Sequence, residues 1–452
     1  MMRMAMFSPV PPVRSGISDY TERLLPHLSK HWEIDLFLDG YGPEIGSVAR
    51  TFTCHHRREF DLKHQRHSYD QIVYQIGNND CHDYIYPTLF RYPGMVILHD
   101  ANLHRARARA SFIRDRLDDY LREIEYCHGS AGRVAGRLVA AGMYNDQIYD
   151  QFPMLNLAVE GASGVIVHNQ YCRDRVSECR LQGEVFMVPA PYMEEVLPDR
   201  ISARKTLGID PGSIVIAAFG FIAPGKGLEA GVTAFERVRN SYDHVRLILI
   251  GEALDADYID KLIAPLSPAT RKNLTITGFV PPEQFRTFLA ASDICLNMRY
   301  PTQGEASSAL LRIMAAKKPV LIPWYRQYME IPRDCCVHVD LYPNEIHFIE
   351  EAIRMLIDHP SICRQIGANA AAYVKRLHTE ENWASAIADA INTTIRNASV
   401  PEPLMKRLDL PNTCPIGVID TISASIGDFH DVFPASTYET LEHCLEELEL
   451  LR

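Results

Sequence analysis

Residues 213–235 read SIVIAAFGFIAPGKGLEAGVTAF, an apolar strand that leads through a glycine-bearing turn into a helix. Short apolar runs of this kind recur between longer amphipathic stretches, an alternation typical of parallel sheets built from βαβ units. Two series of runs predict an α/β protein with two doubly wound, Rossmann-like domains. The runs lie at residues 4–7, 71–76, 95–98 and 164–167, and again at 213–219, 245–250, 273–277, 294–297 and 319–322.

Prolines mark the border between the two series. Pro189, Pro191 and Pro198 fall in VPAPYMEEVLPDR, where they remove backbone donors and restrict the chain, so we predict a linker there. We place the first domain at residues 1–195, the second at 196–385, and a C-terminal extension, with a helix crossing back and a tail, at 386–452. An arginine-rich helical insertion is predicted at about 104–149, and the tail predicts a Glu/Leu-rich helix at 435–451.

The composition narrows the class of protein. The 452 residues include 46 Lys+Arg and 57 Asp+Glu, a formal charge of −11, so we expect no nucleic-acid partner. No apolar run approaches the roughly 18–20 residues that span a bilayer, and the start lacks a signal-peptide pattern, so we expect a cytoplasmic protein. The eleven cysteines show no paired CxxC spacing, and we therefore expect reduced thiols and no metal site.

Ligands of open α/β sheets bind beyond the carboxyl ends of the strands, so the loops that follow the apolar runs are informative. In FSPVPPVRSGISDY, Gly16 precedes a helix whose free amides suit an anion, although a glycine there can also serve only the turn. In FGFIAPGKGLEAGVTAF, Lys226 precedes a helix and could offer positive charge to a leaving phosphate; the alternative is a solvated surface lysine. The second loop is neither a P-loop nor a dinucleotide fingerprint.

A third loop lies in MRYPTQGEASSALLRIMAAKKPVLIPW. We expect Glu305 to begin a helix there, seven residues before Arg312, which would place both on one face about 10 Å apart along the axis. That separation suits a ligand with two polar parts. The alternative is a glutamate that only interacts with the helix dipole.

Together, these loops resemble the retaining glycosyltransferases of family 4, whose GT-B fold has two Rossmann-like domains facing across a cleft. The resemblance covers roughly residues 1–395. The loop ending in Lys226 and Gly227 is similar to a donor-diphosphate loop, LILIGEA and ITGFVPPEQF to the strand ends that line the base, and PTQGEASS with KKPVLIPW to the acidic sugar-binding motif. The first half resembles a branch from polysaccharide and O-antigen gene clusters through PPVRSGISDY, YQIGNNDCHDYIY, VILHDANLH and GVIVHNQYCRD.

The resemblance implies a glycosyltransferase that moves a sugar from a UDP- or GDP-linked nucleotide sugar to a hydroxyl of a glycan or lipid-linked acceptor. It implies retention of configuration, with no metal and no other cofactor. The departing phosphate oxygen would accept the acceptor's proton, and domain closure would exclude water. Two alternatives remain, a nucleotide-sugar epimerase and a non-catalytic GT-B-like binding subunit.

Residue by residue, the resemblance implies catalytic roles for His99 near the transferred sugar, Lys226 on the diphosphate and Glu305 on the sugar hydroxyls. The residues implied in donor binding are Gly16, Gly220, Lys226, Gly227, Gly251, Gly278, Phe279, Val280, Arg299, Glu305, Ala306, Ser307, Ser308 and Arg312. Those implied on the acceptor side are Gly77, Asn78, Asn79, His82 and Asp100.

Two positions depart from the family pattern. Phe221 stands where the family usually has Arg, and Arg312 stands where a second Glu usually contacts the ribose. We hypothesise that Arg299 and Arg312 supply positive charge near the donor instead.

Several of these residues also have a plain structural interpretation. His99 and Asp100 can merely close a strand end, His168 is expected to satisfy backbone groups, and the loop from Gly77 can serve turn chemistry. The arginine-rich stretch from Arg105 predicts a solvated helix face. Its functional alternative is docking onto anionic lipid head groups or a lipid-pyrophosphate acceptor, which would place the protein peripherally at the inner face of the membrane.

Overall fold

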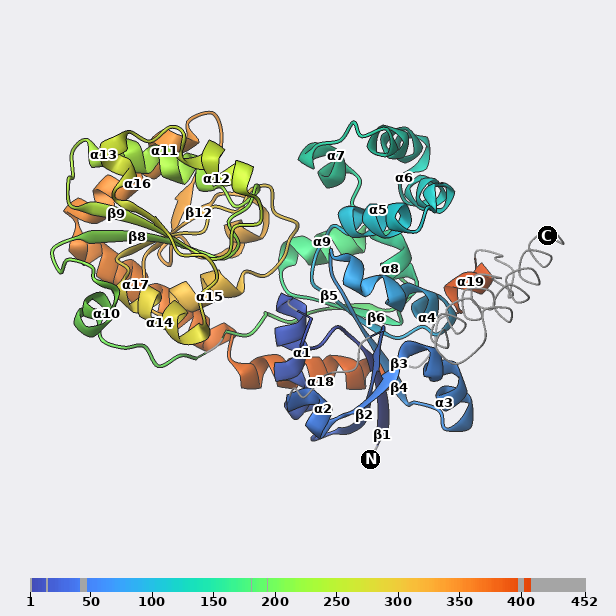
Figure 1. Cartoon of the computed structure of the whole chain (residues 1–452). Helices are drawn as coiled ribbons and strands as arrows, with labels where there is room; N and C mark the ends of the chain where they lie inside the picture. Colours follow the sequence, from blue (N-terminus) through green and yellow to red (C-terminus); the bar gives the residue numbers. More distant parts are fainter. Residues whose placement is uncertain are drawn as a thin grey trace, which may run out of the picture.

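A computed structural model describes residues 2–13, 15–40, 47–179, 181–192, 194–396 and 402–407. The chain forms two α/β domains, each built around one parallel sheet, as the sequence predicts (Figure 1). The helix predicted at 435–451 lies outside the described residues. Within the described residues, no helix is both long and apolar enough to cross a membrane.

The first domain contains a seven-stranded sheet in the order β3-β2-β1-β4-β5-β6-β7, in which all neighbouring strands are parallel. The four runs predicted in this half form β1, β4, β5 and β6. Three strands were missed because polar residues interrupt β2 and because the edge strands β3 and β7 are partly exposed. The strands are β1 (Met2–Phe7), β2 (Trp32–Leu38), β3 (Thr53–His56), β4 (Gln71–Ile76), β5 (Met95–Leu98), β6 (Gly164–Val167) and β7 (Glu184–Met187).

Helices cover both faces of this sheet, and three of them form the predicted insertion after β5. The helices of the first domain are α1 (Gly16–Leu28), α2 (Ser47–Thr51), η1 (Arg57–Glu59), α3 (Phe60–Arg66), η2 (Asp80–Ile85), α4 (Tyr86–Arg91), α5 (His104–Ile113), α6 (Leu117–Ala140), α7 (Asp146–Gln151), α8 (Asn156–Glu160) and α9 (Gln170–Ser177).

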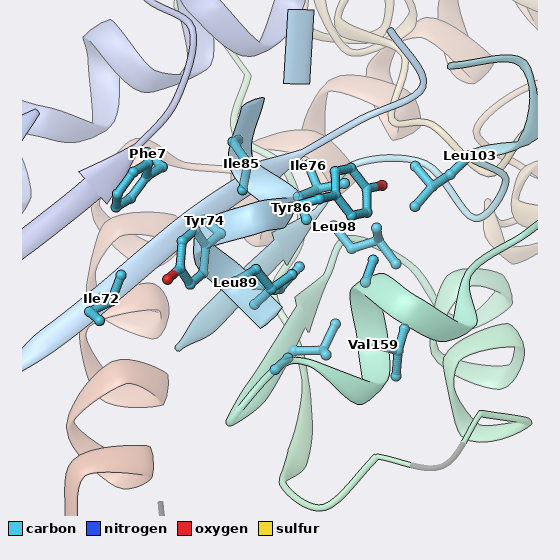
Figure 2. Close-up of a cluster of buried hydrophobic side chains, with 14 of the residues drawn as sticks. Phe7, Ile72, Tyr74, Ile76, Ile85, Tyr86, Leu89, Leu98, Leu103 and Val159 are labelled. Atoms are coloured by element: carbon cyan, nitrogen blue, oxygen red, sulfur yellow. The ribbon is translucent and has the colours of Figure 1, made fainter. Parts of the chain in front are cut away.

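The core of the first domain has two halves, one on each face of the sheet. On one face, side chains such as Phe7, Tyr74 and Leu98 from the strands pack with Leu89 and Val159 from the helices (Figure 2). Every residue of β4 and β5 is buried, which explains why β5 reads as an unbroken apolar run and why β4 is apolar apart from Gln71 and Gln75.

The second domain contains a six-stranded parallel sheet in the order β10-β9-β8-β11-β12-β13. The five predicted runs form five of the strands, and only the short edge strand β13 was missed. The strands are β8 (Ile214–Phe219), β9 (Val245–Ile250), β10 (Leu274–Ile276), β11 (Ile294–Leu296), β12 (Val320–Pro323) and β13 (Val337–Val339). The helices that follow β7 in the chain are α10 (Arg200–Leu207), α11 (Leu228–Arg239), α12 (Ala256–Ile263), α13 (Pro268–Arg271), α14 (Pro282–Ala291), α15 (Ser308–Ala315), η3 (Arg326–Glu330), α16 (Glu345–Asp358), α17 (Pro360–Leu377), α18 (Glu380–Arg396) and α19 (Leu404–Arg407).

The chain crosses between the domains twice. It leaves the first domain after β7 and returns after α17, so that α18 packs beside α1 on the first sheet (Figure 1). There, the buried Trp383 donates its indole N–H to the hydroxyl of Tyr20 at 2.7 Å. Two hydrogen bonds join the two crossing segments. Tyr192 N donates to His378 O at 2.8 Å, and His378 Nδ1 donates to Ala190 O at 2.7 Å. The domain limits at residues 195 and 385 stay predictions.

Candidate functional site

A cavity of about 470 Å³ lies between the domains, and residues from both line it. It opens where β5 of the first sheet and β8 and β11 of the second sheet end, the position at which open α/β sheets bind ligands. Its lining is polar and carries charges of both signs. The lining residues are Asn78, Asp100, Asn102, Arg105, Asp146, Tyr149, Asp150, Pro224, Gly225, Lys226, Arg299, Pro301, Gln303 and Glu305.

Lys226 reaches the cavity from the turn between β8 and α11. The next residue, Gly227, is the N-cap of α11 and has a φ of 63°, a left-handed conformation that favours glycine. A Cβ at Gly227 would lie 1.9 Å from the carbonyl oxygen of Met298, so the turn presses against the end of β11. Burial, together with the nearby Arg299, lowers the pKa of Lys226 to about 8.

Glu305 is held by three hydrogen bonds at the cavity wall. Its Oε1 accepts from Arg299 Nη1 at 3.1 Å, and its Oε2 accepts from Thr302 Oγ1 and from Gln303 N, both at 2.8 Å. Burial alone would raise the pKa of Glu305, but Arg299 and Lys226 outweigh burial and hold that pKa below its usual range. The carboxylate is therefore ionised, and it can accept hydrogen bonds from hydroxyl groups.

The expectation that Glu305 begins a helix is wrong. Helix α15 starts at Ser308, and the side chain of Ser307 caps it by accepting from Leu310 N. Glu305 lies in the preceding loop because its carboxylate bonds within that loop. Glu305 and Arg312 consequently do not share one helix face.

Asp100 faces Glu305 from the first domain, at the end of β5. Its Oδ2 accepts a hydrogen bond from Asn78 N at 2.7 Å. Burial, followed by the proximity of Glu305, raises the pKa of Asp100 to about 7. Asp100 can therefore hold or release a proton close to neutral pH.

The structure brings five predicted site residues together around this cavity: Asn78, Asp100, Lys226, Arg299 and Glu305. One further predicted donor residue lies nearby. Gly220 borders a small hollow that shares Lys226 and Arg299 with the cavity, and Phe221, which departs from the family pattern, borders it too.

The remaining predicted donor residues line neither hollow. Gly251 and Gly278 pair as an antiparallel bridge. Phe279 is exposed and Val280 packs against the core of the second domain. Gly16 is exposed at the start of α1, where the side chain of Ser15 caps the helix. Ala306, Ser307 and Ser308 form the entry to α15.

His99 is partly buried beneath the cavity rather than among its lining residues. Its Nε2 lies 2.5 Å from Gln75 Oε1, and its ring meets Tyr20 edge-on with the ring centroids 4.7 Å apart. Burial and the imidazoles of His168 and His82 hold the pKa of His99 well below its usual range, so the ring is neutral.

The two other predicted histidines satisfy backbone carbonyls. His168 Nδ1 lies 2.8 Å from Val188 O, and His82 Nδ1 lies 2.9 Å from Gln75 O. In the same loop, Asn79 caps η2 by accepting from Cys81 N.

Gly77 is tightly enclosed, since a Cβ there would lie 2.3 Å from Ile17 Cδ1. Of the four residues predicted in this loop, Asn78 lines the cavity. The other three, Gly77, Asn79 and His82, shape the turn.

Arg312 points toward the linker rather than into the cavity. Its Nη2 donates to Glu195 Oε1 at 2.5 Å, and its guanidinium carbon lies 3.4 Å from the centroid of the Phe285 ring. Burial lowers the pKa of Arg312 despite the Glu195 carboxylate. Its side chain thus bridges α15, the linker and α14.

Several arginines of the insertion form ion pairs, and all of these but Arg107 also keep much of their side chain exposed. Arg107 is buried between Asp83 and Glu123, with its Nη2 2.7 Å from Glu123 Oε2. Arg105 pairs with Asp146, and this guanidinium also lies over the ring of Tyr149, 4.6 Å from its centroid. Arg109 and Arg114 pair with carboxylates of η2.

Sequence reasoning missed the part of the cavity that α7 contributes. Asp146, Tyr149 and Asp150 line it, although they belong to the insertion and follow no strand end. The capping residue Asn145 marks the start of α7 but carries no information about the cavity. Among the described residues, no group of three His, Cys, Asp or Glu side chains is arranged to hold a metal ion.

Comparison with known proteins relates the second domain to a known family. Residues 199–373, which form most of the second domain, match the family described as Glycosyl transferases group 1. The second domain is similar to that family. The matched residues include Lys226, Arg299 and Glu305, the three ionisable side chains that the second domain contributes to the cavity.

One relative has a similar sequence over part of the chain, and two solved structures share its fold. The alpha-monoglucosyldiacylglycerol synthase of Acholeplasma laidlawii is 26% identical over 164 residues, which cover 35% of this chain and only 40% of that protein. The sucrose-phosphate synthase of Thermosynechococcus elongatus superposes with a TM-score of 0.63 at 16% identity, covering 88% of this chain and all of that one. HepE from Anabaena, solved with UDP and glucose, has a TM-score of 0.55 at 16% identity, covering 87% of this chain and all of that one. The chain has the GT-B fold.

Proposed function

We propose that the protein is a retaining glycosyltransferase that transfers a sugar from a nucleotide-diphosphate sugar to a hydroxyl of a glycan or lipid-linked acceptor. The observation that carries the proposal is the meeting of Lys226, Arg299 and Glu305 with Asp100 in one cavity between the domains. A cavity of about 470 Å³ is within the size range of small-molecule sites. The UDP and glucose named for HepE make UDP-glucose the first donor to test.

The geometry suggests how the charges would be used. Lys226 and Arg299 are the cations on the second-domain side of the cavity, and they would stabilise the negative charge that develops on the leaving diphosphate. Glu305 would accept a hydrogen bond from a hydroxyl of the donor sugar through Oε1, which accepts only from Arg299 within the loop and keeps a further lone pair, whereas Oε2 already accepts two hydrogen bonds.

The acceptor would enter from the first-domain side of the cavity. Asp100 would contact the acceptor hydroxyl. The departing phosphate oxygen of the donor would take the proton of that hydroxyl, so that no further base and no metal are required. The neutral ring of His99 would support this wall from beneath, through Gln75 and Tyr20. Backbone amides would make the proposed contacts with the donor at Gly16, Gly220, Gly227 and the strand-end glycines Gly251 and Gly278.

A thermal-shift panel of UDP, GDP and their sugars tests donor binding, because a bound ligand stabilises the folded state by mass action. The donor that shifts the melting temperature is then incubated with and without saccharide acceptors, and the product's anomeric configuration is read by NMR. Transfer with retention supports the proposal. An isomerised sugar from donor alone would identify an epimerase, and binding without any turnover would identify a binding subunit.

Metal independence is tested in the same assay. We expect turnover to be unchanged after treatment with EDTA, since Lys226 and Arg299 supply the positive charge that a metal ion provides elsewhere. Loss of turnover that Mg²⁺ or Mn²⁺ restores would contradict this part of the proposal.

We also propose a cytoplasmic location with peripheral contact to an anionic membrane. Because arginines of the insertion are ion-paired, they are not expected to make the main contact with the membrane. Exposed apolar side chains lie on the same insertion and would contribute to that contact. Flotation with phosphatidylglycerol vesicles tests this contact, and an absence of binding at low salt would remove it. The exposed apolar side chains are Phe112, Ile113, Leu117, Val134, Leu138, Met143 and Tyr144.

A further inference from the structure

The short helix η3 of the second domain holds an arginine that bonds to both sides of the cavity. Arg326 Nη2 donates to Asp150 Oδ2 of the first domain at 2.5 Å, and Arg326 Nη1 donates to Thr302 O at 2.5 Å. The guanidinium carbon also lies 5.0 Å from the ring centroid of Tyr171 and 4.7 Å from that of Tyr325. Two hydrogen bonds and two aromatic neighbours fix this side chain in one place.

The backbone of Arg326 is unusual as well. Its φ is 50°, in the left-handed region that residues other than glycine seldom adopt. Such a conformation persists only where the surroundings impose it, and it is concentrated at functional sites. At Arg326 this conformation accompanies the two hydrogen bonds of the guanidinium.

From Thr302, the hydrogen bonds continue to Glu305. Thr302 Oγ1 donates to Glu305 Oε2 at 2.8 Å, while Gln327 Nε2 donates to Thr302 Oγ1 at 2.6 Å and to Glu305 O at 3.2 Å. Asp150, at the other end, lines the cavity on the first-domain side. One connected set of bonds therefore runs from the wall formed by α7 to the Glu305 carboxylate.

The far end of η3 is fixed to the first domain too. The two carboxylate oxygens of Glu330 accept hydrogen bonds from Gln170 N and Tyr171 N, both at 2.9 Å. These amides open α9, where a carboxylate is favoured by the helix dipole. Both ends of η3 thus contact the first domain, and the Glu305 loop lies beside it.

We propose that Arg326 is a positioning residue, which ties the α7 wall of the cavity to the loop that holds Glu305. Glu305 then takes its working position only when the two domains are closed around the cavity. Arg326 itself is not among the lining residues, so it acts through Thr302 and Asp150. This inference rests on the proposed function. It implies that loss of Arg326 lowers turnover much more than nucleotide affinity, because Lys226 lies on a separate turn.

The experiment compares Arg326→Ala, Arg326→Lys and Asp150→Asn with wild type. A matched control is Arg333→Ala, which removes a guanidinium stacked 4.4 Å from the centroid of the nearby Trp324 ring. UDP affinity is measured by calorimetry. The kcat and donor KM are measured for hydrolysis of UDP-glucose, or of GDP-mannose if the panel selects GDP.

For Arg326→Ala we expect kcat to fall at least tenfold while the nucleotide Kd changes less than threefold. Arg326→Lys should recover part of the loss, since an ammonium keeps the charge but lacks the two-pronged donor geometry. Asp150→Asn should lower kcat, and the Arg326→Ala/Asp150→Asn double variant should be little worse than Arg326→Ala, because both changes break one connection. Arg333→Ala should stay within twofold of wild type.

Three results would overturn the proposal: a kcat of Arg326→Ala within twofold of wild type, an equal loss in Arg333→Ala, or a rise in Kd that matches the fall in kcat. If Arg326→Ala does not fold, the Lys and Asn variants decide by the same criteria. If wild type neither binds nucleotide nor consumes donor, the proposed function fails, and X-ray scattering decides the inference. A larger radius of gyration in Arg326→Lys and Asp150→Asn than in wild type would support it, and an unchanged radius would refute it.

Discussion

Donor affinity should depend on pH through Lys226. The pKa of this lysine is lowered from 10.5 to about 8 in the folded protein. The charged form is thereby disfavoured by about 3 kcal/mol relative to water, since one pKa unit corresponds to about 1.4 kcal/mol. A bound diphosphate favours the charged form, so binding above pH 8 must take up a proton.

The size of the effect follows from the fraction of charged lysine. With a pKa near 8, about nine-tenths of Lys226 is charged at pH 7 and about one-tenth at pH 9. If the diphosphate binds only the charged form, the Kd for a nucleotide sugar rises about tenfold between these pH values. The direction of the change is fixed: the affinity for the nucleotide sugar falls as the pH rises, because the lysine loses its proton.

Calorimetry with UDP-glucose, or with the donor that the thermal-shift panel selects, measures this Kd at pH 7, 8 and 9, and buffers of different ionisation enthalpy report the proton uptake. In Lys226→Met, the Kd at pH 7 should be about 10- to 100-fold weaker, the range expected for one charge-assisted hydrogen bond, and it should vary with pH only through the ionisation of Asp100, whose pKa is about 7. Lys226→Arg should likewise lose the lysine's part of the pH dependence, since arginine stays charged throughout. A wild-type Kd that is flat within twofold, or an equal slope in Lys226→Met, would refute the reasoning.

Three further predictions concern single side chains. Glu305→Gln should reduce turnover about 100-fold, the loss typical of removing one electrostatic contact in an active site, with the UDP Kd within threefold; unchanged turnover would show that this carboxylate does not act on the sugar. Gly227→Ala should lower the free energy of unfolding by about 2 kcal/mol or more, because its Cβ would clash with Met298 O at a positive φ. Gly16→Ala, with open space around it, is the control and should stay within about 0.5 kcal/mol in the same urea titration. Trp383→Ala should destabilise the first domain by about 3–5 kcal/mol, measured by urea denaturation, and a loss under 1 kcal/mol would mean that α18 is not anchored there.

The sequence predicts the fold well where burial is complete. Strands β5 and β8 read as unbroken apolar runs because helices cover both faces of their sheets. It fails at β3, β7 and β13, which lie at or near sheet edges and are partly exposed, so that no apolar run marks them. The helix start at Glu305 was misplaced because the cap at Ser307 and the bonds within the loop were invisible to periodicity.

The site is predictable only in its parts. Lys226 and Glu305 follow strand ends, so position along the chain points to them. Asp150 and Arg326 are 176 residues apart, and their meeting depends on how the domains face each other, which no local pattern encodes. The resemblance places Arg312 near the donor, whereas its guanidinium is held by Glu195 of the linker.

The double crossing of the chain also limits how the domains can move. A single linker would allow one domain to swivel in any direction, whereas two neighbouring segments bonded through Tyr192 and His378 would restrict any opening to a swing about the line through them. Contacts beside this line, such as Arg312 with Glu195, would then persist during such a swing. Contacts across the cavity would open and re-form as a set, so that closure would return the two walls to the same register without a search over orientations.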